Sequence, residues 1–176
     1  MGGNQLIRVA RIVALATLFA SLPIPGNHGT AMAQARAPFD TVFSQPAVGV
    51  IDALTGVLLD RGALRAEQVD PTTTALLSAV NRQEQGEFRT PSVDVDRATL
   101  SGLIPANVTQ FLTESGGRYV LEVRIAESAA GTRVTIAPVI VITIPGTENP
   151  LGGRVVPSNG TLERQIVTAL RERLAG

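Results

Sequence analysis

Closely spaced carboxylates are the first residues in this chain that could do chemistry. Asp94 and Asp96 flank a single valine and could offer oxygen ligands to a calcium ion. The stretch around them lacks the third oxygen ligand and the glycine of an EF-hand loop. A turn followed by a helix N-cap explains both aspartates more simply. We therefore predict no metal site here.

Glu84 and Glu87 form a second pair that could serve general acid–base catalysis. The two glutamates lie at a predicted helix end, beside Arg82 and Arg89. This pattern of charges is typical of a solvent-exposed face. Tyr119, the only tyrosine, begins an alternating strand with its ring on the apolar side, which is typical of a core or rim position. No catalytic residue is predicted.

Several mechanisms are excluded by residue types that the chain lacks. It has no Cys, Lys or Trp, and its only histidine is His28. Because His28 lies in a predicted signal region, the exported part has no imidazole for a Ser-His or Cys-His nucleophile. Schiff bases and P-loops need lysine, and zinc and copper sites need His or Cys. Only carboxylate chemistry and oxygen-ligand metals remain, and the candidate carboxylates have simpler structural interpretations. We therefore predict a protein that is not an enzyme and has no cofactor.

Charged residues on one face of a predicted hairpin could instead recognise a partner. These residues are Arg118, Glu122, Arg124 and Arg133. Pairing across the strands is the simpler interpretation, and each pair would contribute about 0.2–1 kcal/mol. A partner-binding surface is the more specific hypothesis, since arginine is enriched at protein interfaces.

The beginning of the chain has the pattern of a secretory signal peptide. Arg8 and Arg11 precede an apolar run at residues 12–20, and an A-x-A cleavage site ends at Ala33, before Gln34. The run is shorter than the roughly 18–20 residues that span a bilayer, which favours cleavage over a membrane anchor. We expect a periplasmic or secreted bacterial protein with no transmembrane span after cleavage. A second, overlapping A-x-A leaves the cleavage position open.

The predicted organisation is a signal peptide (1–33), a flexible N-terminus (34–38) and a single α+β domain (39–176). The chain has 15 basic and 15 acidic residues, and two of the arginines belong to the signal region. The exported part is therefore slightly acidic and lacks the basic surface that nucleic acids or anionic lipids require. We expect no nucleic-acid partner, and the oligomeric state is left open.

The first predicted elements are a strand at 39–43 and an amphipathic helix. Ser44 is the expected helix cap, Pro46 lies near the first turn, and Gly62 suits the C′ position. The expected apolar stripe has helical spacing and consists of Ala47, Val50, Ile51, Leu54, Val57 and Leu58.

The middle of the chain is ambiguous. Residues 64–69 could form a short strand, and Asp70-Pro71 suggests a cap with proline at N1, followed by a helix to about Gln83 that Gly86 terminates. A strand at 74–80 is the alternative, because three consecutive threonines start a helix poorly. The helix is favoured, without excluding the strand.

The segment that follows predicts short elements. Residues 88–95 are extended and broken by Pro91, and Asp96 caps a short helix through Leu103. A second short helix runs from Pro105 to Thr113. Its expected buried face is Val108, Phe111 and Leu112.

The strongest strand signals lie in the second half and predict an antiparallel hairpin with a turn at Gly131. Pro138 marks a bulge or an edge position. Val139 and Val141 make the strand apolar on both sides, so this half should be covered on both faces. The expected inward side chains are Tyr119, Leu121, Val123, Ile125, Val134, Ile136, Ile140, Ile142 and Ile144.

The last element is predicted to be an amphipathic helix with an apolar stripe that includes Leu162, Ile166 and Leu170. Ser158 and Asn159 are strong N-cap types, and Glu163 suits the first turn. Asn159-Gly160-Thr161 also fits a glycan acceptor, but helix capping accounts for the whole stretch.

Together these elements predict a small antiparallel sheet with a long hairpin in the C-terminal half, packed by an N-terminal and a C-terminal amphipathic helix. The segments "GRYVLEVRI", "GTRVTI" and "SNGTLERQIVTAL" resemble the helix-grip domains of the outer-membrane assembly lipoproteins of Gram-negative bacteria. That family is lipidated on a cysteine, which this chain lacks, so a lipid tether is not implied. The resemblance implies a binding or scaffold domain of the cell envelope, with another envelope protein as partner.

A carrier of an apolar molecule or lipid, bound between the hairpin and the helices, is the alternative function. Its motive is the abundance of valine, isoleucine and leucine with few aromatic residues.

Overall fold

The computed structural model describes residues 38–143 and 153–176. The chain divides into two units, Met1–Met32 and Ala33–Gly176, and every described residue belongs to the second. The predicted signal peptide, its cleavage position and residues 34–37 lie outside the described residues. Within the described part, no helix combines the length and the hydropathy needed to cross a membrane.

The described residues form an α+β fold, as predicted, with a 6-stranded antiparallel sheet. In chain order the elements are β1 (Phe39–Phe43), α1 (Ala47–Asp60), α2 (Ala66–Asn81), β2 (Gly86–Arg89), β3 (Val93–Val95), α3 (Arg97–Ser101), α4 (Ala106–Thr109), β4 (Gly117–Ser128), β5 (Gly131–Thr143), β6 (Gly153–Val156) and α5 (Thr161–Ala175).

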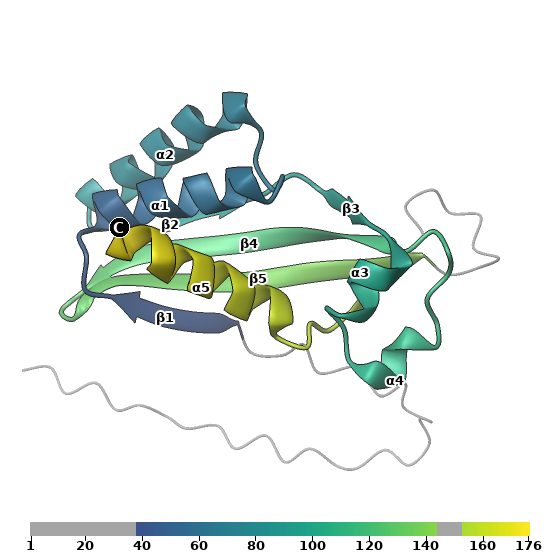
Figure 1. Ribbon diagram of the computed structural model, residues 1–176. Coiled ribbons are helices and arrows are strands. Elements are labelled where there is room, and N and C mark those ends of the chain that lie inside the picture. The colour runs from purple at the N-terminus through teal and green to yellow at the C-terminus, as the bar shows by residue number, and fades with distance from the viewer. Residues whose placement is uncertain (1–37, 144–152) are drawn as a thin grey trace, which may run out of the picture. The chain divides into compact units, whose positions relative to one another are not determined.

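The β4–β5 hairpin is the centre of the sheet, and short strands flank it on both sides (Figure 1). Its register runs from Gly117↔Ile142 to Ser128↔Gly131 without a bulge. β1 and β6 pair with β5 on one side, while β2 and β3 pair with β4 on the other. The predicted hairpin is therefore confirmed.

Pro138 occupies an edge position rather than a bulge. β1 pairs with β5 up to Ile136, and β6 pairs with it from Ile140, so neither strand pairs with Pro138. A residue without a backbone N–H is tolerated where no neighbouring strand requires one. Of the two placements that the sequence allowed, the structure selects the edge.

One face of the sheet carries the main core. Alternation along β4 and β5 directs one row of side chains toward α1 and α5, which lie with α2 on the same side of the sheet (Figure 1). Burying this apolar surface is the main source of stability. The largest completely buried side chains are Ile51, Leu54, Leu58, Leu76, Leu100, Ile104, Leu121, Ile125, Ile136, Ile140, Ile142 and Ile166.

α1 has the predicted stripe but a different beginning. Pro46 is the N-cap, and its carbonyl accepts a hydrogen bond from the N–H of Val50. The prediction of a Ser44 cap is wrong, because that hydroxyl bonds to Gln45 instead. At the other end Gly62 adopts a φ of +68°. Its N–H bonds to the carbonyl of Leu59 at 2.9 Å, which gives the predicted glycine C′ termination.

α2 begins earlier than predicted. It starts at Ala66, after an Arg65 N-cap whose N–H donates to the Gln68 side chain, so the short strand expected at 64–69 is wrong. Pro71 lies inside the helix rather than at N1. The hydrogen bond that this proline cannot donate would end on the carbonyl of exposed Glu67, where water can replace it. The helical interpretation of residues 74–80 is confirmed.

α2 ends at Asn81, and Gln83, with a φ of 59°, adopts the left-handed conformation there. Gly86, the predicted terminator, is instead the first residue of β2. It is small because the Leu76 side chain packs against it, 3.0 Å from where a Cβ would lie. Leu76 and Val80 are the buried residues of α2.

The short elements between α2 and β4 agree in part with the sequence. The segment 88–95 is extended and interrupted at Pro91, and Asp96 caps α3. α4 has only four residues and ends at Thr109. Phe111 was expected on a buried helical face, but it follows this helix end and its side chain is 53% exposed. The prediction for Phe111 is wrong because helical periodicity does not apply beyond Thr109.

Three side chains organise the start of α5. Asn159 accepts a hydrogen bond from the N–H of Thr161 at 2.9 Å and donates to the carbonyls of Gly102 and Ile104. Glu163 is buried, and the Ser158 hydroxyl donates to it at 2.8 Å while accepting from the N–H of Gly160. The N-cap residue is Gly160, so the prediction of Ser158 or Asn159 as the N-cap is wrong, although both side chains accept from backbone N–H groups at the start of the helix. Since both amide hydrogens of Asn159 are bonded, the glycan interpretation is disfavoured.

Candidate functional site: the outer face of the sheet

The second face of the sheet, opposite α1 and α5, is the outer face. Alternation places on it the four residues predicted as a partner surface, Arg118, Glu122, Arg124 and Arg133. Each is exposed or half-buried. They share one surface, but they do not pair with one another across the hairpin: Glu122 lies opposite Ala137, and Arg124 lies opposite Thr135.

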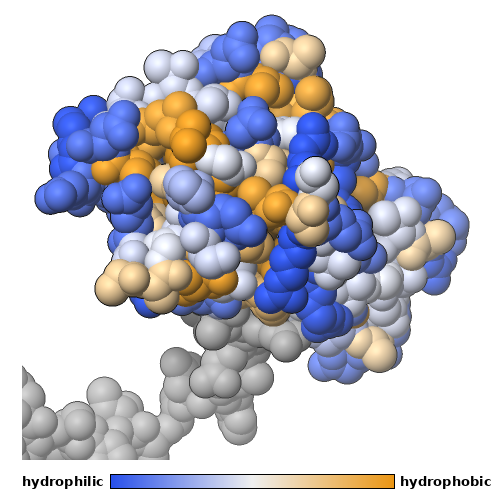
Figure 2. Space-filling model, turned by 60° about the vertical axis from the view of Figure 1, so that its left-hand side comes forward, coloured by the Kyte–Doolittle hydropathy of each residue, from blue (hydrophilic) through white to orange (hydrophobic). Residues whose placement is uncertain are grey.

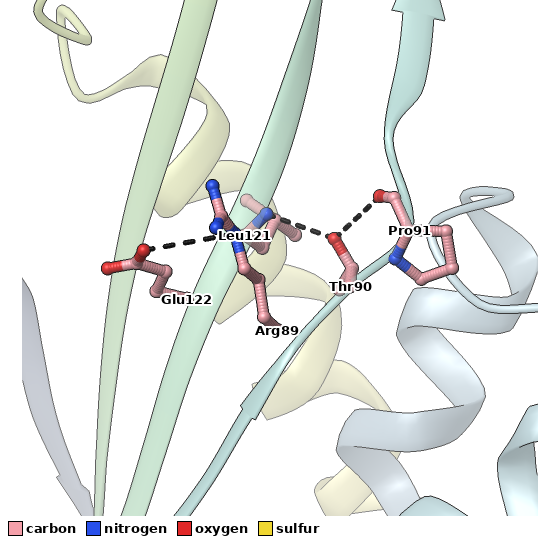
Figure 3. A network of polar contacts seen from close by, with 5 residues as sticks. All are labelled: Arg89, Thr90, Pro91, Leu121 and Glu122. Carbon is pink, nitrogen blue, oxygen red and sulfur yellow. Dashed lines mark hydrogen bonds and ion pairs between the residues drawn. The ribbon is translucent and has the colours of Figure 1, made fainter.

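Three of the four residues form ion pairs with the flanking strands. Arg133 lies 3.8 Å from Asp40 of β1, Arg124 lies 3.0 Å from Glu87 of β2, and Arg89 of β2 lies 3.9 Å from Glu122 (Figure 3). All six side chains are about half exposed, so each pair contributes only ~0–1 kcal/mol. The pairs neutralise this half of the outer face.

Arg118 differs from the other three. Its register partner on β3 is Asp94, yet Arg118 forms no ion pair with any described residue. Its neighbour on β5 is Val141, which pairs in turn with Val155 of β6. An arginine without a bound carboxylate, beside aliphatic side chains, can contact an acidic group and an apolar surface together.

The valines beside Arg118 make this half of the outer face apolar. Val120 lies opposite Val139, and both are half-buried; Val155 on the edge strand is 62% exposed. The sequence predicted cover on both sides of Val139 and Val141. That prediction is wrong within the described residues, because α1, α2 and α5 all lie on the other face (Figure 1). The apolar half and the ion-paired half therefore meet along the hairpin.

Elsewhere on the described surface, exposed apolar side chains do not line up along neighbouring strands. On the side that Figure 2 shows, hydrophobic side chains reach the surface as separate groups among hydrophilic ones. Val48 of α1 is 58% exposed and has hydrophilic or small neighbours along its helix. Isolated exposed apolar side chains of this kind are normal for a folded protein.

The other residues considered for chemistry have structural roles. Asp94 is on the outer face of β3, whereas Asp96 accepts from the N–H of Thr99 at 2.7 Å; this bond holds the Asp96 pKa below its usual 3.8. Among the described residues, no group of three or more His, Cys, Asp or Glu side chains could hold a metal ion. Glu84 pairs with Arg82 and Glu87 with Arg124, so the two glutamates engage different arginines.

Tyr119 is a core residue, as its inward position predicted. It lies between Val93 and Ile140 in register and is 5% exposed. Burial raises the pKa of its hydroxyl above 10.0, and the charge of Arg61 opposes this effect in part. A tyrosine held neutral in the core is a poor general base at neutral pH.

Two features were not predicted from the sequence. Buried Thr90, between β2 and β3, is bonded to β4: its N–H donates to the Leu121 carbonyl, and its hydroxyl accepts from the Leu121 N–H at 3.0 Å (Figure 3). A threonine before Pro91 gives no distinctive signal for such a bridge. The second feature is a pocket of about 550 Å³ beside α4, which includes Phe111 and Arg154. No sequence signal indicated it, because the expected helix to Thr113 placed Phe111 on a buried face.

No protein-family model, no curated protein and no solved structure matches this chain. The resemblance to outer-membrane assembly lipoprotein domains therefore stays a prediction, and the outer face has to be interpreted from its own chemistry.

Proposed function

We propose that this protein is a non-catalytic binding or scaffold protein of the bacterial cell envelope, periplasmic or secreted, that binds another envelope protein through the outer face of its sheet. The observation that supports this most is the position of Arg118. It is a cation without an ion pair to any described residue, surrounded by Val120, Val141 and Val155 on a face that the described helices leave open.

The chemistry of the face defines the partner. The pairs formed by Glu122, Arg124 and Arg133 leave little net charge on one half, so strong electrostatic attraction is not expected there. The other half would bury aliphatic side chains around one arginine. A matching partner presents an apolar surface with a carboxylate opposite Arg118, as at interfaces with an apolar centre and a charged rim.

The residue types of the chain support a role without catalysis. The described part has no histidine, cysteine or lysine, and its carboxylates at Glu84, Glu87, Asp94 and Asp96 engage arginines, cap a helix or stand apart. Its one buried carboxylate, Glu163, is bonded to Ser158 within the α5 cap. None of these side chains is placed as the acid–base pair that a carboxylate-only hydrolase needs.

Site-specific crosslinking tests the proposal. Because the chain has no cysteine, Ala137→Cys places a single thiol at the centre of the outer face for a photo-crosslinker. Ser78→Cys, exposed on α2, is the matched control. In envelope extracts of the host we expect a discrete product from the Ala137 position only, lost when Arg118→Glu is added.

Equal products from both positions, or a product that Arg118→Glu leaves unchanged, would refute the outer face as the partner surface. A product that mass spectrometry identifies as the chain crosslinked to itself would replace the envelope partner with a second copy.

A further inference from the structure

The pocket beside α4 lies at the end of the sheet where β4 begins and β5 ends, away from the α1–α5 core (Figure 1). The segment between α4 and β4 forms one wall, and Ile142 and Arg154, which are register partners on β5 and β6, form the other. Its volume of about 550 Å³ is within the range of sites for small molecules, roughly 300–1,000 Å³.

The pocket combines an apolar interior with excess positive charge. Leu112 and Ile142 are buried behind it, and Phe111, 53% exposed, borders it with an aromatic ring. Covering such an exposed aromatic side chain with a ligand lowers the free energy, because apolar surface is removed from water.

Two arginines and one glutamate line the pocket. Glu114 is paired with Arg97, whereas Arg154 forms no ion pair with a described residue. The described lining residues therefore carry one net positive charge. An anion placed in the pocket would meet the Arg154 guanidinium beside apolar walls, where a charge-assisted hydrogen bond is stronger than in water.

Thr113 also lines the pocket, but its hydroxyl oxygen is closed to solvent. That oxygen finds no hydrogen-bond partner among the described residues. A ligand in the open pocket would therefore contact the rest of this side chain and not the oxygen.

From this juxtaposition we infer that the pocket binds a small amphipathic anion, a molecule with one carboxylate or phosphate group and an apolar body. Arg154 pairs with the anionic group, and Phe111 and Leu112 contact the apolar body. This site differs in position and chemistry from the outer face, so it does not depend on the proposed protein partner. It places the apolar ligand at the sheet end, whereas the sequence suggested a site between the hairpin and the helices.

Calorimetric titration of the purified protein with decanoate and with decyl phosphate tests the inference, below the concentrations at which they form micelles. Decanol and decyltrimethylammonium are the neutral and cationic controls. We expect at least one anion to bind about tenfold or more tightly than both controls, as one charged hydrogen bond would give. The stronger of the two anions identifies the natural head group as carboxylate or phosphate.

Three variants make the test specific. Arg154→Gln should weaken anion binding about tenfold, while Arg164→Gln, an exposed arginine of α5 outside the pocket, should leave it unchanged. Glu114→Gln removes the only carboxylate among the described lining residues and frees Arg97, so it should tighten anion binding. A partly unfolded protein would not bind more tightly, so this opposite sign separates ligand contact from damage to the fold.

The inference is overturned if neither anion binds, if the cation binds as well as the anions, or if Arg154→Gln binds as the unaltered protein does. Equal effects of Arg154→Gln and Arg164→Gln would also overturn it, because attraction would then depend on net charge alone.

Discussion

At the scale of single residues, the described part of this chain uses its polar groups for structure. Asp96 caps α3, Thr90 joins two strands, and Asn159 connects the α3–α4 region to α5. The sequence identified Asp96 and Asn159 because capping depends on local spacing. It did not identify Thr90, because its partner Leu121 is distant in the chain and only the sheet register brings the two together.

Asn159→Ala should cost more than an ordinary cap. The substitution removes the side-chain amide. The Thr161 N–H then loses its acceptor, and the carbonyls of Gly102 and Ile104 lose their donor. We expect the free energy of unfolding to fall by about 2 kcal/mol. A capping bond contributes ~0.5–2 kcal/mol, and each further hydrogen bond contributes ~0.5–1.5 kcal/mol. Urea titration measures it. Exposed Asn107→Ala is the control and should stay within about 0.5 kcal/mol; equal effects would contradict this account of Asn159.

Tyr119 should titrate above its ordinary pKa of 10.0. Burial favours the neutral phenol, so the folded pKa lies above the unfolded one. The resulting stabilisation is complete below pH 10.0 and is lost as the pH rises through the folded pKa. With one tyrosine and no tryptophan, tyrosinate absorbance reports this group alone. A native midpoint equal to the one in strong denaturant would show that the ring is not buried.

At the scale of elements, hydrophobic periodicity predicted which helices and strands exist better than it predicted where they begin and end. The alternation in β4 and β5 and the apolar stripes of α1 and α5 are long patterns, so the hairpin and both packing helices were found. The errors fell on short or punctuated segments. The sequence predicts a helix start at Pro71, whereas the hydrogen bond from the Arg65 N–H to Gln68 begins the helix earlier; it also predicts Phe111 in a helix that ends sooner.

The docking of α5 on the sheet can be tested with Ile166→Ala. Ile166 is completely buried, and α5 packs against β5 and α1. The cavity should cost about 2–5 kcal/mol, a large part of the roughly 5–15 kcal/mol that stabilises a domain. Thr168→Ala, exposed on the same helix, should change the urea midpoint little. An unchanged midpoint for Ile166→Ala would mean that α5 does not contribute to the core.

The β2–β3 junction can be tested with Thr90→Val. Valine keeps the shape but leaves the Leu121 N–H buried without its acceptor, at a cost of about 1–3 kcal/mol. Thr90→Ser retains the hydroxyl and should be less destabilised. If the serine variant unfolds at the lower urea concentration, the methyl group rather than the hydrogen bond is what stabilises the junction.

At the scale of the whole molecule, the two faces of the sheet have different tasks. The inner face is covered by α1 and α5 and supplies the core. The outer face carries ion pairs that add little stability and, around Arg118, valines that the described helices leave uncovered. The sequence predicted this arginine-bearing face from alternation alone. It could not show which arginine of this face has no ion pair with a described residue, because that depends on how β1, β2 and β3 flank the hairpin.

We propose that the outer face binds a partner and is not needed for folding. The most direct measurement compares the partner-crosslinking yield of Ala137→Cys protein carrying Val155→Asp with the yield of the same protein carrying Val48→Asp. Both valines are exposed, at 62% and 58%, but only Val155 lies on the outer face. We expect Val155→Asp to abolish the crosslink and Val48→Asp to preserve it, with both variants folded. Equal yields from the two variants would contradict the claim.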